Sequence, residues 1–231
     1  MPRVIVVIGA SRGLGLELCH QYLVRGDKVY ACCRKPEQAS ELLAMKQEYA
    51  DRLETVPLDV NNEGMLKNLP HAINESVDIL IHNAGIYGPK QRTFDQVEAK
   101  DWMEVLHTNT VAPLMVIQQL ADKVSAGHEK KIILMSSKVG SMGDNNSGGS
   151  YMYRSSKAAL NSVGKSLSID LKDRGIKVAI VHPGWVRTDM GGPNGLIDVE
   201  TSITGLVKVI DSLTEAKSGQ FLAYDGAEIP W

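Results

Sequence analysis

A tyrosine and a lysine stand four residues apart in the second half of the chain, at Tyr153 and Lys157. Leucines follow them at helical spacing, and residues four apart share one face of a helix, so the phenol and the ammonium are expected to face one cleft. A neighbouring ammonium, together with the positive ring of an oxidised nicotinamide cofactor, stabilises a phenolate and brings the tyrosine pKa, about 10 in water, closer to neutral pH. Tyr153 could then exchange a proton with a substrate oxygen. The alternative is an exposed pair without function, because this spacing is common on helices.

A glycine-rich turn near the N-terminus follows an apolar run and precedes apolar residues at helical spacing. Its sequence is Gly9-Ala10-Ser11-Arg12-Gly13-Leu14-Gly15. Glycines allow a tight turn and a close approach of the backbone to a ligand, and the free amides at a helix start attract the pyrophosphate of a dinucleotide. No Lys-Ser or Lys-Thr pair follows the last glycine, which argues against a P-loop. The motif predicts a dinucleotide site, and a turn that binds nothing is the alternative.

Charged residues indicate which dinucleotide binds. The second apolar run ends in Cys32-Cys33-Arg34-Lys35, without the carboxylate that would bind the ribose 2′-hydroxyl of NAD. Arg12 inside the turn and Arg34 near the adenosine ribose could instead clamp a 2′-phosphate, so the predicted cofactor is NADPH or NADP. Either arginine could also be a solvated surface charge. Asp59 and Val60 follow the third apolar run and are assigned to the adenine end, although an Asp there is as often a helix cap.

Short apolar runs alternate with longer segments of helical spacing along the chain. The expected strands are residues 4–8, 29–33, 53–58, 77–81, 132–135 and 178–181. Buried runs that alternate with helices are typical of parallel strands covered on both faces, so we predict an α/β doubly wound sheet. Ligands bind such sheets in the loops after the carboxyl ends of the strands. The expected substrate loops are approximately residues 86–95, 138–150 and 184–197, with a glycine-rich mobile loop over 140–150.

The bulk composition narrows the class of protein. A chain of 231 residues, 43% of them hydrophobic, suits one domain over residues 1–231. A net charge of -2 without a Lys/Arg cluster argues against nucleic acid or membrane as partner. No apolar run has the length of a signal sequence or a membrane span. Cys19, Cys32 and Cys33 have neither zinc-ligand nor disulfide spacing, so no metal is expected and the protein is expected in the cytoplasm.

Six motifs occur in the order found in the short-chain dehydrogenase/reductase superfamily, and together they span almost the whole chain. They are Gly9-x-x-x-Gly13-x-Gly15, Asn83-Ala84-Gly85, Asn109, Ser136-Ser137, Tyr153-x-x-x-Lys157 and Pro183-Gly184. The segments around Tyr153 and after Pro183, with the ending Tyr224-Asp225-Gly226, resemble C-factor-like and sniffer-like carbonyl reductases. The resemblance implies a Rossmann-type, mostly parallel seven-stranded sheet in one domain, and a homodimer or homotetramer. Ile8 departs from the pattern, because many relatives have threonine there.

The resemblance also implies a role for each motif. Tyr153 would be the general acid in reduction and the base in oxidation, while Lys157 would orient the nicotinamide ribose and tune Tyr153. Ser137 would hydrogen-bond the substrate oxygen, as an oxyanion donor does. Asn109 would hold a water that links Lys157 to solvent. With Tyr153 and Lys157, the expected cofactor-binding residues are Gly9, Ser11, Arg12, Gly13, Leu14, Gly15, Arg34, Asp59, Val60, Asn83, Ala84, Gly85, Pro183, Gly184, Val186 and Thr188.

Three of these assignments leave an alternative open. Ser136 could replace Ser137, because neighbours on a strand face opposite sides and a shift of one residue exchanges them. Asn109, shortly before Pro113, could satisfy a kinked helix instead of holding a water. Thr188 could be the N-cap of a short helix.

The predicted function is NADPH-dependent reduction of a carbonyl to an alcohol by hydride transfer. The substrate would be a small aldehyde, ketone or quinone, because apolar side chains dominate the expected loops. These side chains are Ile86, Tyr87, Val139, Met142, Trp185, Met190 and Leu196. Two alternatives from other classes stay open: a signalling protein that binds nucleotide and acts through a partner, and a non-redox epimerase or dehydratase that consumes no NADPH.

Overall fold

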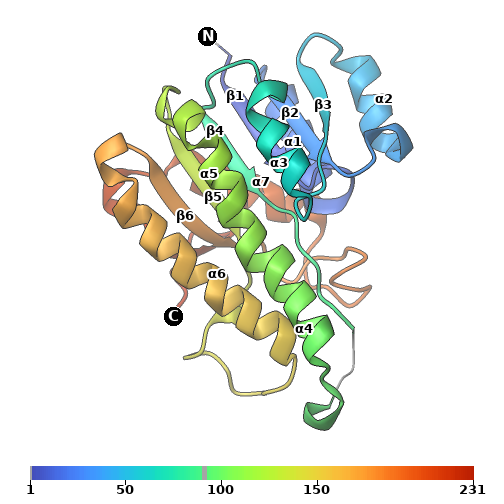
Figure 1. The fold of residues 1–231 in the computed structure, drawn as a ribbon, viewed down its shortest axis with the longest axis vertical. Coiled ribbons are helices and arrows are strands. Elements are labelled where there is room, and N and C mark those ends of the chain that lie inside the picture. The colour runs from blue at the N-terminus through green and yellow to red at the C-terminus, as the bar shows by residue number, and fades with distance from the viewer. Residues whose placement is uncertain (1, 90–92) are drawn as a thin grey trace.

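A single seven-stranded sheet forms the centre of the molecule in the computed structural model, which describes residues 2–89 and 93–231 (Figure 1). Its strands lie in the order β3-β2-β1-β4-β5-β6-β7, and every neighbouring pair is parallel. The prediction of a doubly wound, Rossmann-type sheet is confirmed. All six predicted runs form strands, although β4 begins two residues later than expected. The strands are β1 (Val4–Ile8), β2 (Lys28–Cys33), β3 (Leu53–Pro57), β4 (Ile79–His82), β5 (Lys131–Met135), β6 (Lys177–His182) and β7 (Phe221–Ala223).

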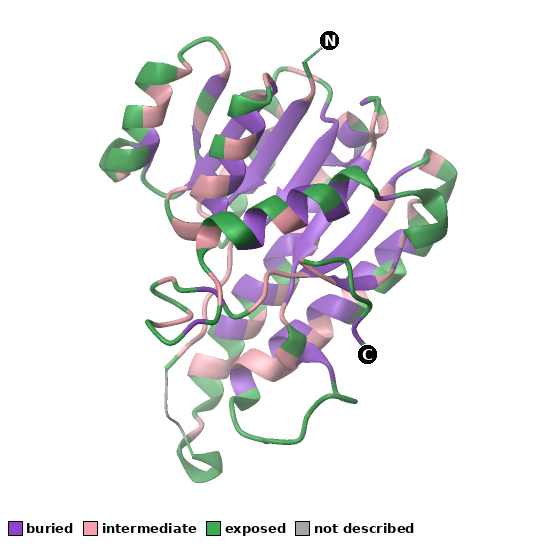
Figure 2. Ribbon diagram, turned by 180° about the vertical axis from the view of Figure 1, so that it is seen from behind, coloured by how far each residue is buried: buried purple, intermediate pink, exposed green. Residues whose placement is uncertain are grey.

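Helices cover both faces of the sheet, whose strands are almost entirely buried (Figure 2). One apolar cluster joins Ile5 and Val7 to α1, α2 and α7, and a second joins Val6 and Ile8 to α3, α5 and α6. Successive strand residues therefore feed opposite cores, which explains why the strands read as continuous apolar runs. The helices are α1 (Gly13–Val24), α2 (Ser40–Glu48), α3 (Glu63–Ala72), α4 (Ala99–Leu106), α5 (Ala112–Ser125), α6 (Tyr151–Asp170) and α7 (Val199–Asp211).

Helices α4 and α5 continue into each other through a π-helical turn, His107–Val111. Together they run beside α6 across one face of the sheet (Figure 1). Trp102 Nε1 donates a hydrogen bond to Ser155 Oγ at 2.8 Å, and Thr110 Oγ1 donates to the carbonyl of Ser156 at 2.9 Å. These bonds join α4 and the π-helical turn to the first half of α6, the part of the molecule that carries the predicted tyrosine and lysine. Single π turns inside helices are frequent at functional sites.

The carboxyl ends of the parallel strands all lie at one edge of the sheet, where the predicted loops emerge. The loop after β5 begins with a short 3-10 turn, Lys138–Gly140, and residues 142–150 are exposed (Figure 2). The loop 184–197 contains an isolated bridge between Val186 and Ile197, so it folds back on itself. Part of the predicted loop 86–95 lies outside the described residues. The mobility expected of residues 140–150 stays a prediction.

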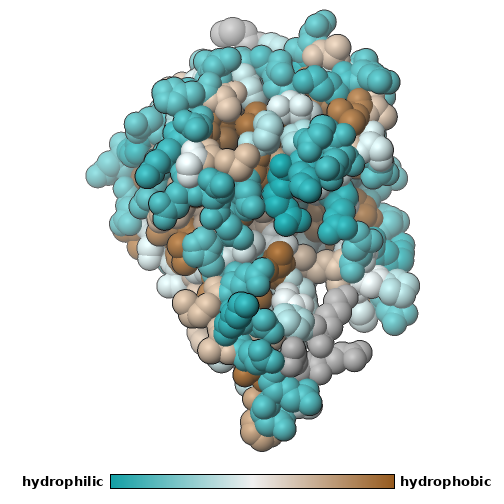
Figure 3. Space-filling view, turned by 45° about the vertical axis from the view of Figure 1, so that its right-hand side comes forward, coloured by the Kyte–Doolittle hydropathy of each residue, from teal (hydrophilic) through white to brown (hydrophobic). Residues whose placement is uncertain are grey.

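The outer surface is mainly hydrophilic on the face shown in Figure 3, where apolar side chains occur in small groups. Across the described residues, no helix combines the length and the hydropathy that a membrane crossing requires. His, Cys, Asp and Glu side chains form no group that could hold a metal ion in the same part of the chain.

The glycine turn after β1 is packed directly against the loop after β4. Gly9 has a φ of +88°, and a Cβ atom there would lie 2.7 Å from the Cα of Ala84. A Cβ atom at Gly15 would collide with the carbonyl oxygen of Gly9. Asn83 Nδ2 donates a hydrogen bond to that same carbonyl at 2.8 Å. Close packing therefore requires glycine at both positions. The Asn83-Ala84-Gly85 motif contacts the turn through Asn83 and Ala84.

Replacing Gly9 with alanine is expected to lower the free energy of unfolding by about 2–5 kcal/mol. A side chain in the left-handed region costs about 1–2 kcal/mol, and forcing a methyl group into a packed contact costs about 1–3 kcal/mol more. Gly26 is the matched control, because it has the same φ of +88° and nothing lies within 4 Å of the position that a Cβ atom would take there. In denaturant unfolding, Gly26→Ala should lose only the cost of the left-handed conformation, about 1–2 kcal/mol. Equal losses in the two variants would contradict the packing argument.

Candidate active site

The predicted tyrosine and lysine lie close together in the first turns of α6. Lys157 Nζ is 5.7 Å from the centroid of the Tyr153 ring, and it donates a hydrogen bond to the carbonyl of Met135 at 2.8 Å. The lysine is only 4% exposed. A Cβ atom at Gly85 would lie 3.5 Å from Nζ, so the loop after β4 closes over the ammonium. The expectation that the phenol and the ammonium occupy one cleft agrees with this geometry.

The two pKa values move in opposite directions. Burial lowers the pKa of Lys157 to about 8, because the ammonium loses hydration. Burial also raises the pKa of Tyr153 to about 12; the hydrogen bond from Ser137 opposes this rise and the nearby Tyr87 adds to it. In the protein without cofactor, desolvation therefore sets the direction of the Tyr153 pKa. The fall expected beside an oxidised cofactor stays a prediction. At neutral pH, Tyr153 keeps its proton.

The two adjacent serines have different partners. Ser137 lies beside the hydroxyl of Tyr153 and lowers the pKa of that group, and its Oγ accepts a 3.4 Å hydrogen bond from the amide of Val139. Ser136 is 2% exposed, and its Oγ donates to Asn161 Oδ1 at 2.5 Å. Strand β5 ends at Met135, so the chain turns between the two serines. Ser137 is thus the serine beside the phenol, while Ser136 joins the sheet to α6.

Asn109 lies in the π-helical turn and is fully buried. Its Oδ1 accepts a hydrogen bond from the amide of Ile86, and its Nδ2 donates to the carbonyl of the same residue, both at 2.8 Å. Nδ2 also donates to Ser156 Oγ at 3.0 Å. The side chain therefore clamps the loop after Gly85 instead of satisfying a kink in its own helix. The water relay through Asn109 stays a prediction.

The glycine turn has the features that a pyrophosphate requires. Helix α1 begins at Gly13, and within the described chain no side chain caps its N-terminus. The amides at this end are thus available to an anion. Ser11 and Leu14 are half-buried in the turn. The residues and the backbone present here fit the phosphates of a dinucleotide.

Arg12 forms an ion pair with Asp189 at 2.6 Å. Asp189 belongs to the loop 184–197, so the pair joins the glycine turn to the predicted substrate loop. Both side chains are about three-quarters exposed, and an exposed pair of this kind contributes little stability. Arg12 can therefore exchange Asp189 for a phosphate. Sequence reasoning missed Asp189, because an exposed Asp in a loop carries no signal of its partner.

The remaining predicted cofactor residues lie at the same edge of the sheet. Arg34 follows β2 and is exposed, and Val60 is buried beyond β3. Asp59 Oδ1 accepts from the amide of Asn61, and the cap of α3 is Asn62. The helix-cap alternative for Asp59 is wrong, because Asn62 is the N-cap of α3.

The loop after β6 is held by several short contacts. Gly184 has a φ of +87°, and the carbonyl of Pro183 accepts a hydrogen bond from Ser202 Oγ at 2.5 Å. Val186 is buried and pairs with Ile197. Thr188 Oγ1 accepts from the amide of Gly191 at 3.1 Å within a turn, and no helix follows it before Val199. The helix N-cap alternative for Thr188 is therefore wrong.

Two of the seven predicted apolar wall residues contact Tyr153 directly. The rings of Tyr87 and Tyr153 are stacked with centroids 4.7 Å apart, and Met190 Sδ lies 4.0 Å from the Tyr153 hydroxyl. Met142 and Leu196 are instead about three-quarters exposed. The space at the phenol is thus bounded by an aromatic ring and a thioether, both of which favour apolar groups.

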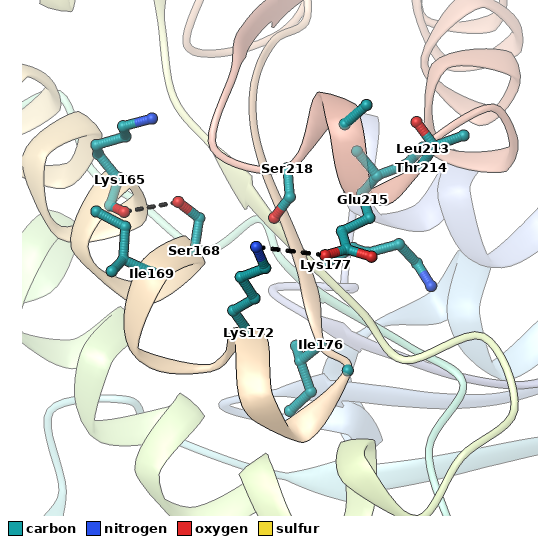
Figure 4. Close-up of a pocket in the computed structure, with 12 residues that line it drawn as sticks. Lys165, Ser168, Ile169, Lys172, Ile176, Lys177, Leu213, Thr214, Glu215 and Ser218 are labelled. Carbon is teal, nitrogen blue, oxygen red and sulfur yellow. Dashed lines mark hydrogen bonds and ion pairs between the residues drawn. The ribbon is translucent and has the colours of Figure 1, made fainter.

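A separate pocket of about 1030 Å³ lies at the opposite end of the sheet, between α6, the start of β6 and residues 213–218. Lys172 there pairs with Glu215 at 3.5 Å. Figure 4 shows the ammonium groups of Lys165 and Lys177 pointing away from that pair. None of the predicted site residues lines this pocket, so its size does not make it the site of the chemistry.

The glycine turn, Asn109, Ser137, Tyr153 and Lys157 thus meet at the carboxyl edge of a doubly wound sheet. The family model of the short chain dehydrogenases matches residues 3–195, and the chain belongs to this family.

Solved structures and curated proteins support a narrower resemblance. The carbonyl reductase Sniffer of D. melanogaster is 34% identical, with a TM-score of 0.92 and full coverage of both chains. The NADPH-bound carbonyl reductase from chicken fatty liver is 32% identical, with a TM-score of 0.92 over 100% of this chain and 99% of that one. C-signal of Myxococcus xanthus is 39% identical over 155 residues, which are 67% of this chain and 93% of that protein. The predicted resemblance to sniffer-like and C-factor-like proteins is confirmed.

Lys157→Met is expected to change how stability depends on pH. The folded pKa of Lys157, about 8, lies below its ordinary value of 10.5. Between these values the unfolded chain binds more protons, so this lysine adds stability as the pH rises through the window and destabilises below it. The stability of wild type relative to the variant should rise by on the order of 3 kcal/mol from pH 8 towards 10.5. Urea unfolding of both proteins at each pH measures this; a difference independent of pH would disprove the burial effect.

Proposed function

We propose that this protein is an NADPH-dependent reductase that converts a carbonyl to an alcohol. The observation that carries the proposal is the arrangement at the carboxyl edge: Ser137 lies beside the hydroxyl of Tyr153, and the buried Lys157 ammonium lies 5.7 Å from the same ring. This set provides a proton donor, a second hydrogen-bond donor and a positive charge beside one another.

The cofactor proposal rests on the glycine turn and on the charges around it. The amides at the start of α1 would hold the pyrophosphate, while Arg12 and Arg34 would hold a 2′-phosphate that no acid at the end of β2 opposes. The NADPH-bound chicken carbonyl reductase, with its TM-score of 0.92, supports the same cofactor. When bound, NADPH supplies the hydride that the carbonyl carbon accepts.

The proton for the carbonyl oxygen would come from Tyr153. Its pKa of about 12 keeps the phenol protonated at neutral pH, which suits a general acid in the direction of reduction. Ser137 would hydrogen-bond the same oxygen as negative charge develops on it. Lys157 would stabilise the phenolate left behind, because its ammonium lies near the ring and cannot move without losing the bond to Met135.

The proposed substrate is an apolar aldehyde, ketone or quinone. Met190 Sδ and the ring of Tyr87 bound the space around the phenol oxygen. Trp185 is half-exposed on the same loop as Met190, and its Nε1 donates to the carbonyl of Gly191 at 2.8 Å. A substrate oxygen that reaches Tyr153 must displace the thioether, so the loop 184–197 would adjust as substrate enters.

The similarity to C-signal supports a second candidate, a signalling protein that binds the nucleotide and acts through a partner. It predicts tight NADPH binding without turnover of any carbonyl. An epimerase or dehydratase would instead turn over its substrate without net loss of NADPH.

We also place the protein in the cytoplasm, since all three cysteines are free, buried thiols. The dimer or tetramer implied by the family stays a prediction, which the molar mass measured by light scattering would test.

Tyr153→Phe should lower kcat for carbonyl reduction by about 10²- to 10⁴-fold, the usual contribution of a general acid. NADPH affinity should stay the same, because the variant keeps the ring and loses only the hydroxyl. NADPH oxidation is measured by absorbance against a panel of apolar aldehydes, ketones and quinones, with NADH in parallel as the poorer cofactor. Tyr151→Phe is the matched control, because that exposed tyrosine lies two residues away in the same helix. Undiminished turnover in Tyr153→Phe would refute the mechanism, and binding without turnover in wild type would favour the signalling candidate.

Ser137→Ala should impair catalysis, whereas Ser136→Ala should impair stability. Loss of Ser137 removes a donor to the reacting oxygen and should lower kcat by about 10²- to 10³-fold with little change in stability. Loss of Ser136 leaves the buried Asn161 without its partner and should cost about 1–3 kcal/mol of stability. Steady-state kinetics and thermal unfolding of both variants separate the roles. The reverse pattern would make Ser136 the substrate donor.

A further inference from the structure

Tyr87 makes two contacts with the start of α6. Its ring stacks on the ring of Tyr153 with centroids 4.7 Å apart and an angle of 29° between the planes. Its hydroxyl shares a 2.8 Å hydrogen bond with Ser150 Oγ. Ser150 directly precedes α6 and has a φ of +48°, a conformation that a side chain rarely adopts without support. One residue of the loop after β4 thus contacts both the phenol and the residue from which its helix begins.

The backbone on both sides of Tyr87 is held in place. The preceding residue, Ile86, has both its amide and its carbonyl bonded to the buried side chain of Asn109. The following residue, Gly88, has a φ of +78°, and a Cβ atom there would lie 2.7 Å from Val105 Cγ2. The loop can therefore neither slide along α4 nor lift away from the π-helical turn. Tyr87 presents its ring to Tyr153 from a fixed base.

We propose that Tyr87 is a positioning residue for Tyr153: its ring fixes the orientation of the phenol, and its hydroxyl fixes the start of α6 through Ser150. This inference rests on the proposed role of Tyr153 as the general acid. It assigns to Tyr87 a task beyond that of an apolar wall of the substrate site.

The geometry around Tyr153 explains why such a residue is needed. A tyrosine on a helix turns about two side-chain bonds, and a hydrogen bond at the hydroxyl alone does not fix the plane of the ring. Ser137 acts at the hydroxyl, and Lys157 lies 5.7 Å from the ring centroid. The stacked ring of Tyr87 sets the plane. Proton transfer depends steeply on such alignment, and a misplacement of about 1 Å can cost about 10²-fold in rate.

Tyr87 acts through Tyr153 and not on the substrate oxygen, because its own hydroxyl is engaged by Ser150. Its presence also raises the pKa of Tyr153. A residue that served only as a wall would change substrate affinity, whereas a positioning residue changes the rate of the bound complex and the pH at which the phenol loses its proton. These two effects can be measured separately.

The experiment compares Tyr87→Leu, which removes the stack, with Tyr87→Phe, which keeps the ring and loses the bond to Ser150. Tyr151→Leu serves as the control for loss of an exposed tyrosine at the start of α6. We expect Tyr87→Leu to lower kcat about 10- to 100-fold, with KM and NADPH affinity changed by less than about threefold. Tyr87→Phe should restore most of kcat. In the direction of alcohol oxidation, the rise of kcat with pH should move to lower pH in both Tyr87 variants, because the group that raises the pKa of Tyr153 is gone.

An unchanged kcat with a raised KM in Tyr87→Leu would overturn the proposal and leave Tyr87 as a wall. If Tyr87→Leu does not fold, Tyr87→Met takes its place, since it also removes the stacked ring, and an unchanged kcat with a raised KM in that variant would overturn the proposal as well. The same assays on Tyr153→Phe keep the two proposals apart. An active Tyr153→Phe means that the proposed function fails, whereas an inactive Tyr153→Phe beside a normal Tyr87→Leu means that only the positioning role fails.

Discussion

One hydrogen bond organises the edge of the sheet where the chemistry is proposed: Lys157 Nζ donates to the carbonyl of Met135, the last residue of β5. Burying an ammonium group costs free energy unless the group is hydrogen-bonded. This bond therefore holds the start of α6 against the end of β5. Two other segments of the chain pack closely against Lys157. A Cβ atom at Gly140 would lie 2.8 Å from the carbonyl carbon of Lys157, and the loop at Gly85 reaches the ammonium from the other direction. The position of Tyr153, one helical turn before Lys157, depends on this arrangement.

Three separate stretches of chain converge on the start of α6. The turn after β5 brings Ser137 to the phenol, the loop after β4 brings Tyr87 to the ring, and the π-helical turn brings Asn109 under that loop. The loop after β6 completes the enclosure with Met190. Since these groups come from different connections of one parallel sheet, small changes in any loop alter the substrate space while the acid and the lysine stay in place. This division explains how one family fold serves many substrates.

Burial moves the pKa values of the two titratable groups at the site in opposite directions. It raises the pKa of Tyr153 to about 12 and lowers that of Lys157 to about 8, so the phenol keeps its proton at neutral pH. At the cofactor end, the ion pair between Arg12 and Asp189 connects the glycine turn to the loop that carries Met190. One charged contact therefore joins the predicted cofactor turn to the predicted substrate loop.

The amino-acid sequence by itself determined the doubly wound sheet, the glycine turn and the pairing of Tyr153 with Lys157. These features depend on local rules: the period of apolar residues, the backbone freedom of glycine and the 3.6-residue turn of a helix. Only the tertiary structure decided which serine meets the phenol, that Asn109 clamps Ile86, and that Asp189 pairs with Arg12. It also showed that burial raises the pKa of Tyr153 in the protein without cofactor. Hydrogen-bond partners and desolvation are set by groups far apart in the chain, whose distances no local pattern encodes.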